Sequence, residues 1–393
     1  MLEKKLKPGW KIWRFDQIAT NVNVRIDNPS ESGMEHYVGL EHLDPDSLRI
    51  RRWGSPDDVE ATKLVFKKGD IIFGRRRAYQ RKLGVAEFDG ICSAHAMVLR
   101  AKPEVVLPEF LPFFMQSDLF MNRAVEISVG SLSPTINWKT LAIQEFALPP
   151  LEEQRPAVTV LQAATDNCCA IEEACSAAGR ALQSYKDVLI GGNASADATD
   201  YLLGDLLLGS PESGCSAPPR DAATGHFVLG LAALSRNGYV SGDYKPVEPT
   251  SKMLAAKLTA GDLLISRSNT VDRVGYVGIF CDDRDDVSFP DTMMRLRPNP
   301  ALILPSFLEA LLQTTTARDY LMRIAAGTSA SMKKINRANL LKMPLKVPSL
   351  RDQGSAIKRL NELKLALEAQ RSRLDDARQL TKLIAARAMD GEA

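Results

Sequence analysis

The chain has 393 residues, 45% of them hydrophobic and 25% charged, and its formal net charge is only +2. This is ordinary globular composition with room for two or three domains, and it excludes binding to a polyanion through overall charge, so any such binding needs local basic patches. The six cysteines show no C-x-x-C spacing, which favours free thiols in a reducing cytoplasm over a disulfide or zinc framework.

The first ten residues are charged and have no apolar core, so they do not resemble a signal peptide. No apolar run reaches the length of about 18 residues that a membrane span requires. We therefore expect a cytoplasmic protein without membrane contact.

A mixed α+β domain is predicted over residues 1–150. Short apolar runs separated by Gly, Asp and Pro predict strands at 37–40, 64–66, 71–73 and 96–99. A single helix is predicted over 107–124, because Pro108-Glu109 marks a helix start and the phenylalanines that follow lie near one face. Residues 128–134 are a loop by composition.

A long helix is predicted from Leu151 to about Ile190, ending at Gly191-Gly192. Its apolar residues recur at alternating spacings of three and four, which is the heptad pattern of a helix that lies along another helix. At ~1.5 Å per residue it would span roughly 60 Å. The expected contact positions are Leu161, Ala164, Cys168, Ile171, Cys175, Ala178, Leu182, Tyr185 and Leu189.

The same pattern returns 199 residues later, which predicts a second long helix over 350–393. Its positions are Leu360, Leu363, Leu367, Gln370, Leu374, Ala377, Thr381, Ile384 and Ala388, with Gln370 and Thr381 as polar exceptions. The predicted order is therefore a first domain at 1–150, a helix at 151–192, a second domain at 193–349 and a helix at 350–393.

The second half of the chain repeats the first. Gly-Asp-Ile-Ile-Phe-Gly-Arg at 69–75 corresponds to Gly-Asp-Leu-Leu-Ile-Ser-Arg at 261–267, and Pro-Pro-Leu-Glu-Glu-Gln at 149–154 corresponds to Pro-Ser-Leu-Arg-Asp-Gln at 348–353. The helices agree in register, whereas the domains differ greatly in detail. This indicates two different specificities on one symmetric frame; the alternative is a duplication that only enlarged the protein.

A basic cluster between Lys63 and Lys82 suits phosphate contact and reading of guanine edges, because the guanidinium fork matches both geometries. The corresponding segment of the second domain carries more amide and hydroxyl groups, and Asn pairs with an adenine edge. A solvated basic face is the alternative. The DNA-binding candidates are Arg75, Arg76, Arg77, Tyr79, Gln80, Arg81, Lys82, Arg267, Ser268, Asn269, Thr270 and Arg273.

Catalytic signatures are missing from the sequence. It has no P-loop, no G-x-G-x-x-G fingerprint and no Asn-Pro-Pro-aromatic tetrapeptide of an adenine methyltransferase. The histidines at 36, 42, 95 and 226 are scattered, and we interpret His95 as a packed residue. We expect no catalysis, no metal and no cofactor in this chain.

Three stretches together resemble the specificity subunits of type I restriction-modification systems. They are GDIIFGRRRAYQRKLGVAEFDGICSAHAMVLRAK at 69–102, GSLSPTINWKTLAIQEFALPPLEEQ at 130–154 and GDLLISRSNTVDRVGYVG at 261–278. The resemblance implies two target-recognition domains joined by two long antiparallel helices, without catalytic activity. It also implies a role in phage defence with double-stranded DNA, two copies of an adenine methyltransferase subunit that binds S-adenosylmethionine, and restriction/translocase subunits as partners.

The expected function is recognition of a bipartite, asymmetric DNA target, one half by each domain. Two half-sites about one helical turn apart, ~34 Å, would fit two domains on paired helices. Two other classes stay open: the DNA-targeting subunit of another phage-defence complex, and a scaffold whose domains bind proteins.

Overall fold

The computed structural model describes residues 6–190, 198–222, 224–327 and 332–392, and the chain divides into two compact units. Unit 1 comprises residues 1–172 and 372–393, and unit 2 comprises residues 173–371. The two long helices, α5 (Leu151–Tyr185) and α10 (Leu350–Ala388), each contribute one end to each unit.

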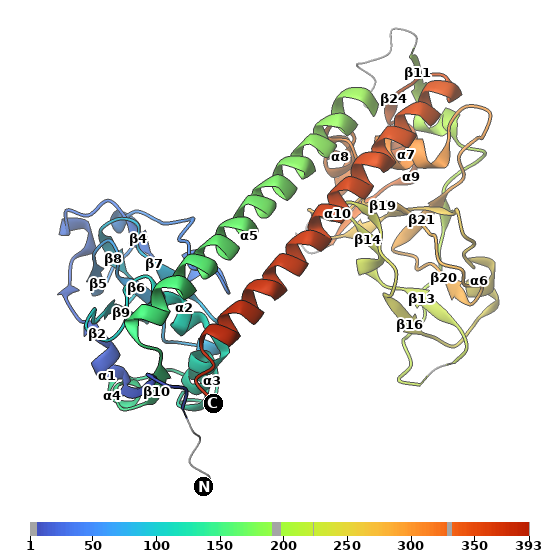
Figure 1. Cartoon of the computed structure of the whole chain (residues 1–393). Helices are drawn as coiled ribbons and strands as arrows, with labels where there is room; N and C mark the ends of the chain where they lie inside the picture. Colours follow the sequence, from blue (N-terminus) through green and yellow to red (C-terminus); the bar gives the residue numbers. More distant parts are fainter. Residues whose placement is uncertain (1–5, 191–197, 223, 328–331, 393) are drawn as a thin grey trace. The chain divides into compact units, whose positions relative to one another are not determined.

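Unit 1 contains two four-stranded sheets and one strand pair (Figure 1). The first sheet is antiparallel in the order β2 (Ala19–Val22), β9 (Ala96–Ala101), β6 (Ile71–Gly74), β7 (Leu83–Val85). The second has the order β3 (Arg25–Ile26), β5 (Lys63–Phe66), β8 (Gly90–Cys92), β4 (Tyr37–Val38), with β4 parallel to β8. The strand pair joins β1 (Lys11–Arg14) to β10 (Glu145–Leu148).

Short helices complete unit 1: α1 (Phe15–Ile18), α2 (Phe110–Gln116), α3 (Asp118–Glu126) and α4 (Trp138–Ala142). The prediction of one helix over 107–124 is wrong, because the chain breaks at Ser117. That residue is extended (φ −65°, ψ 155°), and its Oγ accepts a hydrogen bond from Phe120 N at 3.4 Å, which caps α3. The break folds α3 back so that Phe114 and Phe120 meet Phe15 and Phe146 in the core.

Unit 2 repeats this plan. Its main sheet has the order β12 (Glu212–Ser213), β21 (Met293–Leu296), β17 (Leu263–Ser266), β19 (Val277–Ile279), which matches β2, β9, β6, β7. A second sheet has the order β16 (Tyr244–Pro246), β13 (Phe227–Leu229), β20 (Val287–Ser288), again with one parallel pair. The pair β11 (Thr199–Leu202) and β24 (Pro344–Val347) matches β1 and β10.

The helices of unit 2 also have counterparts: α7 (Pro305–Leu312), α8 (Thr315–Ile324) and α9 (Arg337–Leu341) correspond to α2, α3 and α4. Thr314 caps α8 as Ser117 caps α3. The smaller elements are α6 (Ser251–Ala255), β14 (Leu234–Ser235), β15 (Gly238–Tyr239), β18 (Ser268–Asn269), β22 (Ala325–Ala326) and β23 (Lys333–Ile335). The expected α+β class with an internal repeat is confirmed.

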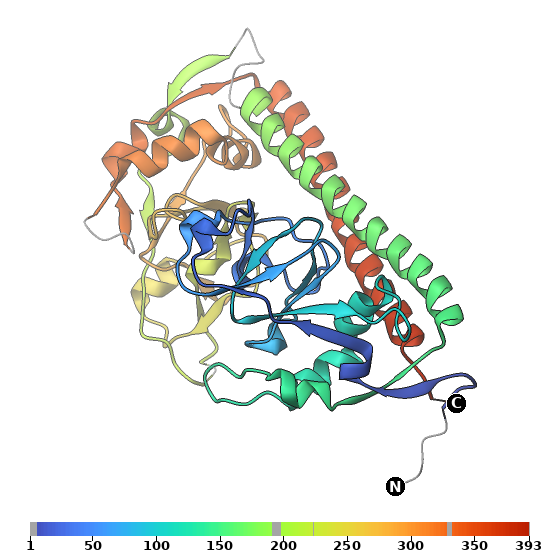
Figure 2. The same cartoon turned by 90° about the vertical axis from the view of Figure 1, so that its left-hand side faces the viewer.

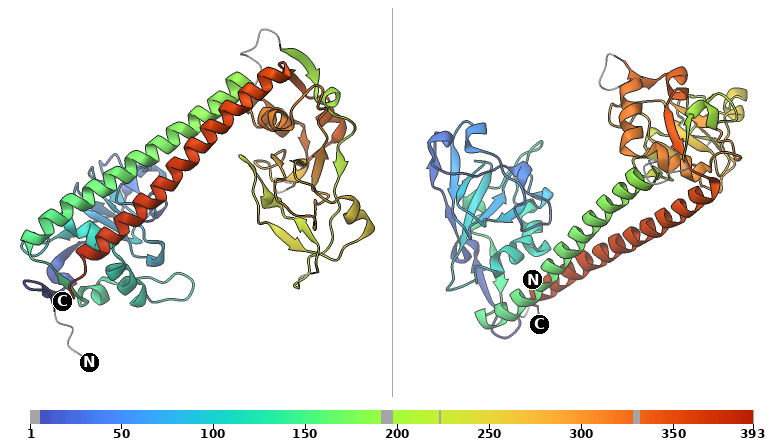
Figure 3. Two further views of the ribbon diagram at one scale, coloured as in Figure 1. Left: turned by 45° about the vertical axis from the view of Figure 1, so that its right-hand side comes forward. Right: turned by 90° about the horizontal axis from the view of Figure 1, so that it is seen from above.

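The long helices lie side by side and antiparallel within each unit (Figure 3). In unit 1, Cys168 Sγ lies 3.5 Å from Thr381 Oγ1, so one polar exception in the heptad pattern is paired. In unit 2, Tyr185 OH donates to the carbonyl of Ala356 at 3.3 Å. A short π-helix, η5 (Lys186–Ile190), continues α5.

The heptad prediction is confirmed at most positions. Leu161, Leu360, Leu367 and Leu374 are buried, but Leu363 is 40% exposed, so that position was assigned wrongly to the contact face. The side chain of Leu189 and the expected stop at 191–192 lie outside the described part of the chain.

One glutamine holds the start of each long helix. Gln154 is fully buried; its Oε1 accepts from Leu107 N (2.8 Å), and its Nε2 donates to the carbonyls of Val105 (3.1 Å) and Pro149 (2.9 Å). Gln353 makes the same three bonds in unit 2, to Leu304 N (2.8 Å) and to the carbonyls of Leu302 and Pro348 (2.9 Å each). Each glutamine therefore fastens its helix to the segment before α2 or α7.

The first and last described segments of the chain, near Lys7 and Gly391, lie together in unit 1 (Figure 2). Lys7 N donates to the carbonyl of Gly391 at 2.9 Å, and Met389 is buried in the same core as Phe15. None of the helices in the described residues is both long and apolar enough to cross a membrane.

Candidate nucleic-acid interface

The structure divides the basic cluster between two faces of unit 1. Arg75, Arg76 and Arg77 follow β6 and lie against the 128–135 loop. Arg76 forms an antiparallel bridge with Thr135, and Arg77 N donates to the carbonyl of Pro134 at 2.7 Å. The guanidinium groups of Arg76 and Arg77 both donate to Ser133 Oγ at 3.2 Å. The loop thus positions these arginines.

A short 3-10 helix, η4 (Ala78–Gln80), separates them from the rest of the cluster. The residues on either side of it, Arg77 and Arg81, have left-handed φ values of 58° and 54°, which non-glycine residues seldom adopt. Tyr79 at the tip is 55% exposed, and Gln80 is half-buried. The turn sends the two ends of the cluster in different directions.

Beyond the turn, the basic side chains are occupied by other groups of the protein. Arg81 Nε lies 2.6 Å from Asp46 Oδ1, and its Nη1 lies 2.9 Å from Asp118 Oδ1. Lys82 Nζ donates to the carbonyl of Leu40 at 2.7 Å. Contact of these two residues with DNA stays a prediction, and it would require these bonds to open or be shared.

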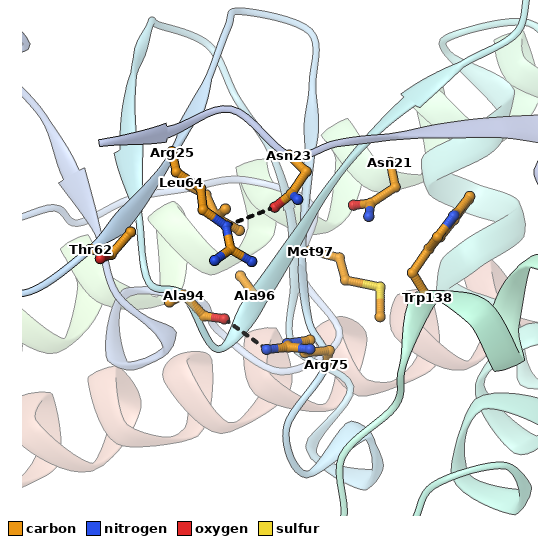
Figure 4. Close-up of a pocket in the computed structure, with 10 residues that line it drawn as sticks. All are labelled: Asn21, Asn23, Arg25, Thr62, Leu64, Arg75, Ala94, Ala96, Met97 and Trp138. Carbon is orange, nitrogen blue, oxygen red and sulfur yellow. Dashed lines mark hydrogen bonds between the residues drawn. The ribbon is translucent and has the colours of Figure 1, made fainter. Parts of the chain in front are cut away.

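A pocket of about 310 Å³ lies between the two sheets on the Arg75 side (Figure 4). Its polar wall combines residues from separate strands and one helix, and Trp138 at the start of α4 stands at one end. The polar and aromatic side chains that line it are Asn21, Asn23, Arg25, Thr62, Arg75 and Trp138.

Two guanidinium groups face this pocket with unused hydrogen-bonding capacity. Arg75 Nη2 donates to the carbonyl of Ala94 at 3.1 Å, while its Nε is buried without an acceptor. Arg25 Nε donates to Asn23 Oδ1 at 3.3 Å. Together with the amide of Asn21, they offer donors and acceptors of the kinds that read base edges and phosphates, whereas the Thr62 hydroxyl already donates to Asp27 Oδ1 at 2.9 Å and keeps only its acceptor capacity.

Sequence reasoning identified Arg75 here but missed Asn21, Asn23, Arg25 and Thr62. They reach the pocket through the pairing of β2 with β9 and of β3 with β5, which joins segments far apart in the sequence. No local pattern marks them.

In unit 2 the predicted residues have mixed surroundings. Ser268 and Asn269 form β18, which pairs with β23, and they are only 5% and 8% exposed. The amide of Asn269 is used within the protein: Nδ2 donates to Ser266 Oγ (3.3 Å), and Oδ1 accepts from Thr270 N (2.9 Å). Arg267 is half-buried.

The outer part of this segment is exposed and charged. Thr270 Oγ1 donates to Asp272 at 2.6 Å, which lowers the pKa of that carboxyl group, and Arg273 lies 3.8 Å from the same aspartate. At the position that Trp138 holds in unit 1, unit 2 has Arg337, whose guanidinium donates to Ser213 Oγ on β12. Corresponding positions therefore carry different chemistry in the two units.

The described residues contain no cluster of three or more His, Cys, Asp or Glu side chains that could hold a metal ion. Of the four histidines, His226 is buried, its Nε2 lies 2.8 Å from Ser288 Oγ, and burial lowers its pKa.

Residues 58–178 match the family model of the type I restriction modification DNA specificity domain. The chain is 22% identical to the type I restriction enzyme EcoKI specificity subunit of Escherichia coli (strain K12), over 99% of this chain and 90% of that protein. It is 30% identical to the EcoDI specificity subunit of Escherichia coli, over 38% of this chain and 33% of that protein.

Two solved structures share the fold. One, described for the complex assembly and conformational transition of the type I R-M system, has a TM-score of 0.63 at 20% identity and covers 99% of this chain and 100% of that one. The other is the type I restriction-modification S subunit from M. genitalium, with a TM-score of 0.53 at 12% identity over 100% of this chain and 99% of that one.

Proposed function

We propose that this chain is a specificity subunit of a type I restriction-modification system, which selects a bipartite, asymmetric DNA sequence and directs methyltransferase and restriction subunits to it; the match of residues 58–178 to the DNA specificity domain and the similarity to the EcoKI specificity subunit support this. The observation that carries the proposal is the pair of units with one sheet order and different residues at corresponding positions, such as Trp138 and Arg337. Two units that share one fold but carry different side chains on the corresponding face suit two half-sites of different sequence.

In unit 1 we assign reading of one half-site to the pocket face. Asn21 and Asn23 suit adenine edges, and Arg25 and Arg75 suit guanine edges or phosphates, by the geometry of amide and guanidinium groups. Arg76 and Arg77, held by the 128–135 loop, suit phosphate contact at the border of this face. Tyr79 is exposed beside them.

In unit 2 we assign the second half-site to the corresponding face, with the exposed Arg273 and Arg337 and the half-buried Arg267 and Thr270 as candidate contacts. Because Ser268 and Asn269 are buried and hydrogen-bonded within the sheet, we propose that they shape this face rather than touch bases.

The proposed partners are double-stranded DNA, two copies of an adenine methyltransferase subunit and restriction/translocase subunits, in the cytoplasm. S-adenosylmethionine would bind the methyltransferase subunit, and this chain would carry no catalytic step. Its contribution is positional, because the bases that it reads determine where its partners act.

The test is methylome sequencing of the host with the gene intact, deleted, and restored as wild type or as variants. Deletion should abolish one bipartite methylation motif, and wild type should restore it. Replacing Asn21 and Asn23 by alanine should relax only one half of the motif. The matched control is Arg14→Ala, an exposed residue on β1 that lies outside the pocket and pairs with Asp16.

An unchanged methylome after deletion would refute the proposal and favour another defence complex or a scaffold. Loss of both halves in the Asn21/Asn23 variant, with intact protein, would remove the pocket from half-site reading.

A further inference from the structure

The 128–135 loop of unit 1 carries the two most exposed large hydrophobic side chains among the described residues. Leu132 is 90% exposed and Val129 is 73% exposed. The segment from Ile127 to Asn137, which contains the loop, has no charged residue. A partner that covers this loop would remove apolar surface from water, which is favourable.

The loop is a hairpin whose ends are fixed. Val129 N donates to the carbonyl of Thr135 at 3.1 Å, and Thr135 N donates back to the carbonyl of Val129 at 3.0 Å. Ser128 Oγ donates to the carbonyl of Ala124 at 2.8 Å, which fastens one leg of the hairpin to α3. Leu132 lies midway between the paired residues and therefore forms the tip.

Arginines lie directly beside this tip. The guanidinium groups of Arg76 and Arg77 donate to Oγ of Ser133, the residue that follows Leu132. In the described part of the chain neither arginine forms an ion pair with a carboxylate, and each guanidinium keeps further N–H donors. Arg75, which precedes them, lines the pocket of about 310 Å³. Pocket, cations and apolar tip are therefore neighbours.

Unit 2 repeats this combination with other residues. Gly327 corresponds to Gly130, and Met332 in the segment that follows it is 55% exposed. Met332 directly precedes the half-buried Lys333 and the exposed Lys334. An exposed apolar side chain next to cations thus recurs although the residue types differ.

We propose that Leu132 is a wedge that enters between two stacked base pairs of bound DNA and kinks the duplex; this rests on the proposed function. Leucine is among the side chains that proteins insert between base steps, and such insertion kinks DNA by about 20–90°. With the pocket face on base edges in the major groove, Arg76 and Arg77 would hold the phosphates at its border, and the tip would enter the adjoining minor groove.

Charge and rigidity favour duplex DNA as the occupant of this tip. DNA offers phosphates for the arginines and an apolar base stack for the leucine, whereas a protein groove would need carboxylates of its own beside an apolar pocket. The hydrogen bonds that close the hairpin limit the conformational entropy lost when the tip inserts, which offsets part of the cost of unstacking.

Such a wedge adds sequence selectivity without a hydrogen bond to a base. Pyrimidine–purine steps such as TA and CA are easily kinked or unstacked, and steps of other kinds cost more to open. The step that receives Leu132 would therefore be selected by its deformability.

The experiment measures unstacking and bending of the methylation motif by the full-length chain. Duplexes carry the adenine analogue 2-aminopurine at each adenine in turn, within and beside the half-site that the Asn21/Asn23 variant relaxes. Unstacking relieves quenching by neighbouring bases, so the wild type should raise the fluorescence at one step at least about twofold. Methyltransferase subunits are left out, because they take their target base out of the stack. Gel mobility of circularly permuted fragments gives the bend angle.

Leu132→Ser should abolish the rise in fluorescence and lower the bend below about 20°, but leave the salt slope of binding unchanged, because Arg76 and Arg77 still meet phosphates. Leu132→Met should keep both signals, since methionine also serves as a wedge. Leu365→Ser makes the same change at a 65% exposed position of α10 and should behave as the wild type.

A second readout selects duplexes in which the base pairs beside this half-site are randomised. The wild type should enrich pyrimidine–purine steps at one position, and Leu132→Ser should not.

A wild type that binds the motif without bending or unstacking it overturns the wedge and leaves the proposed function intact. Equal signals in Leu132→Ser and the wild type overturn it as well. If Leu132→Ser instead weakens association with the methyltransferase subunit in native mass spectrometry and leaves both DNA signals unchanged, the tip contacts a protein and the wedge is refuted. A methylome unchanged by deletion of the gene would refute the proposed function, and the wedge with it.

Discussion

Replacing Gln154 by methionine tests whether the start of α5 depends on one buried amide. The change keeps the length of the side chain and removes its bonds to Leu107 N and to the carbonyls of Val105 and Pro149. Each buried polar group left without a partner costs about 1–3 kcal/mol, so three of them set the expected loss at about 3–9 kcal/mol. This is a large share of the stability of a domain.

The assay is hydrogen exchange of backbone amides, because it resolves the two units where a single unfolding midpoint would not. Gln154→Met should lower protection at least 100-fold in α2 and the first turn of α5, which corresponds to about 2.7 kcal/mol. Gln353→Met should do the same in α7 and the first turn of α10, and each variant should leave the other unit unchanged.

The matched control is Gln162→Met, an exposed position of α5 whose amide donates to Asp166 at 3.1 Å. Its protection should equal that of the wild type. A loss below about 1 kcal/mol in Gln154→Met, or equal loss in both units, would refute the view that these amides fasten the helices.

Three other predictions follow from the geometry. Replacing Arg75, Arg76 and Arg77 by alanine should weaken DNA binding and reduce the salt slope of a titration by about 1–3, at ~0.9 per phosphate contact, and an unchanged slope would remove these arginines from the interface. Arg81→Ala tests the remaining prediction for a guanidinium that is paired with Asp46: a slope reduced by about 0.9 would place Arg81 on the DNA, and an unchanged slope would remove it. Seven residues inserted after both Glu172 and Arg371 lengthen each long helix by about 10.5 Å. Methylome sequencing should then show that the unread spacer between the two half-sites is longer by about three base pairs, at ~3.4 Å each. An unchanged spacer would refute the idea that the helices set the spacing of the half-sites. Burial, and then the charge of Lys364, lowers the pKa of Lys186 from 10.5 to about 8. Between these values the unfolded chain binds more protons than the folded chain, so the free energy of unfolding of unit 2 should rise with pH there by about 3 kcal/mol. Lys186→Met should flatten this rise in urea titrations, and the same rise in the variant and the wild type would contradict the prediction.

Local periodicity explains what the sequence could predict. Burial of Leu161, Leu360, Leu367 and Leu374 follows from spacings of three and four residues, which a helix converts into one face. The repeat likewise indicated that the second domain is built like the first. Leu363 shows the limit, because a position in the pattern is buried only where the partner helix or a domain covers it.

Long-range contacts explain what the sequence could not predict. Gln154 reads as an ordinary polar residue of a first helical turn, and only the distant segment at 105–107 gives it three bonds. Asn21, Asn23 and Arg25 come together with Arg75 through strand pairing. The turn that separates Arg81 from Arg77 depends on left-handed backbone at these two residues themselves, and no glycine in the sequence marks it.

The contact between the segments at Lys7 and Gly391 has a consequence for synthesis on the ribosome. The core of unit 1 includes Met389, and Ile384 and Ala388 pack against it, so this core stays open until translation has passed these residues. Unit 2 needs nothing beyond residue 371. Although domains usually fold in the order of their synthesis, here the unit that begins first is completed last, and a nascent chain stopped before residue 384 would carry a finished unit 2 beside an exposed aromatic core.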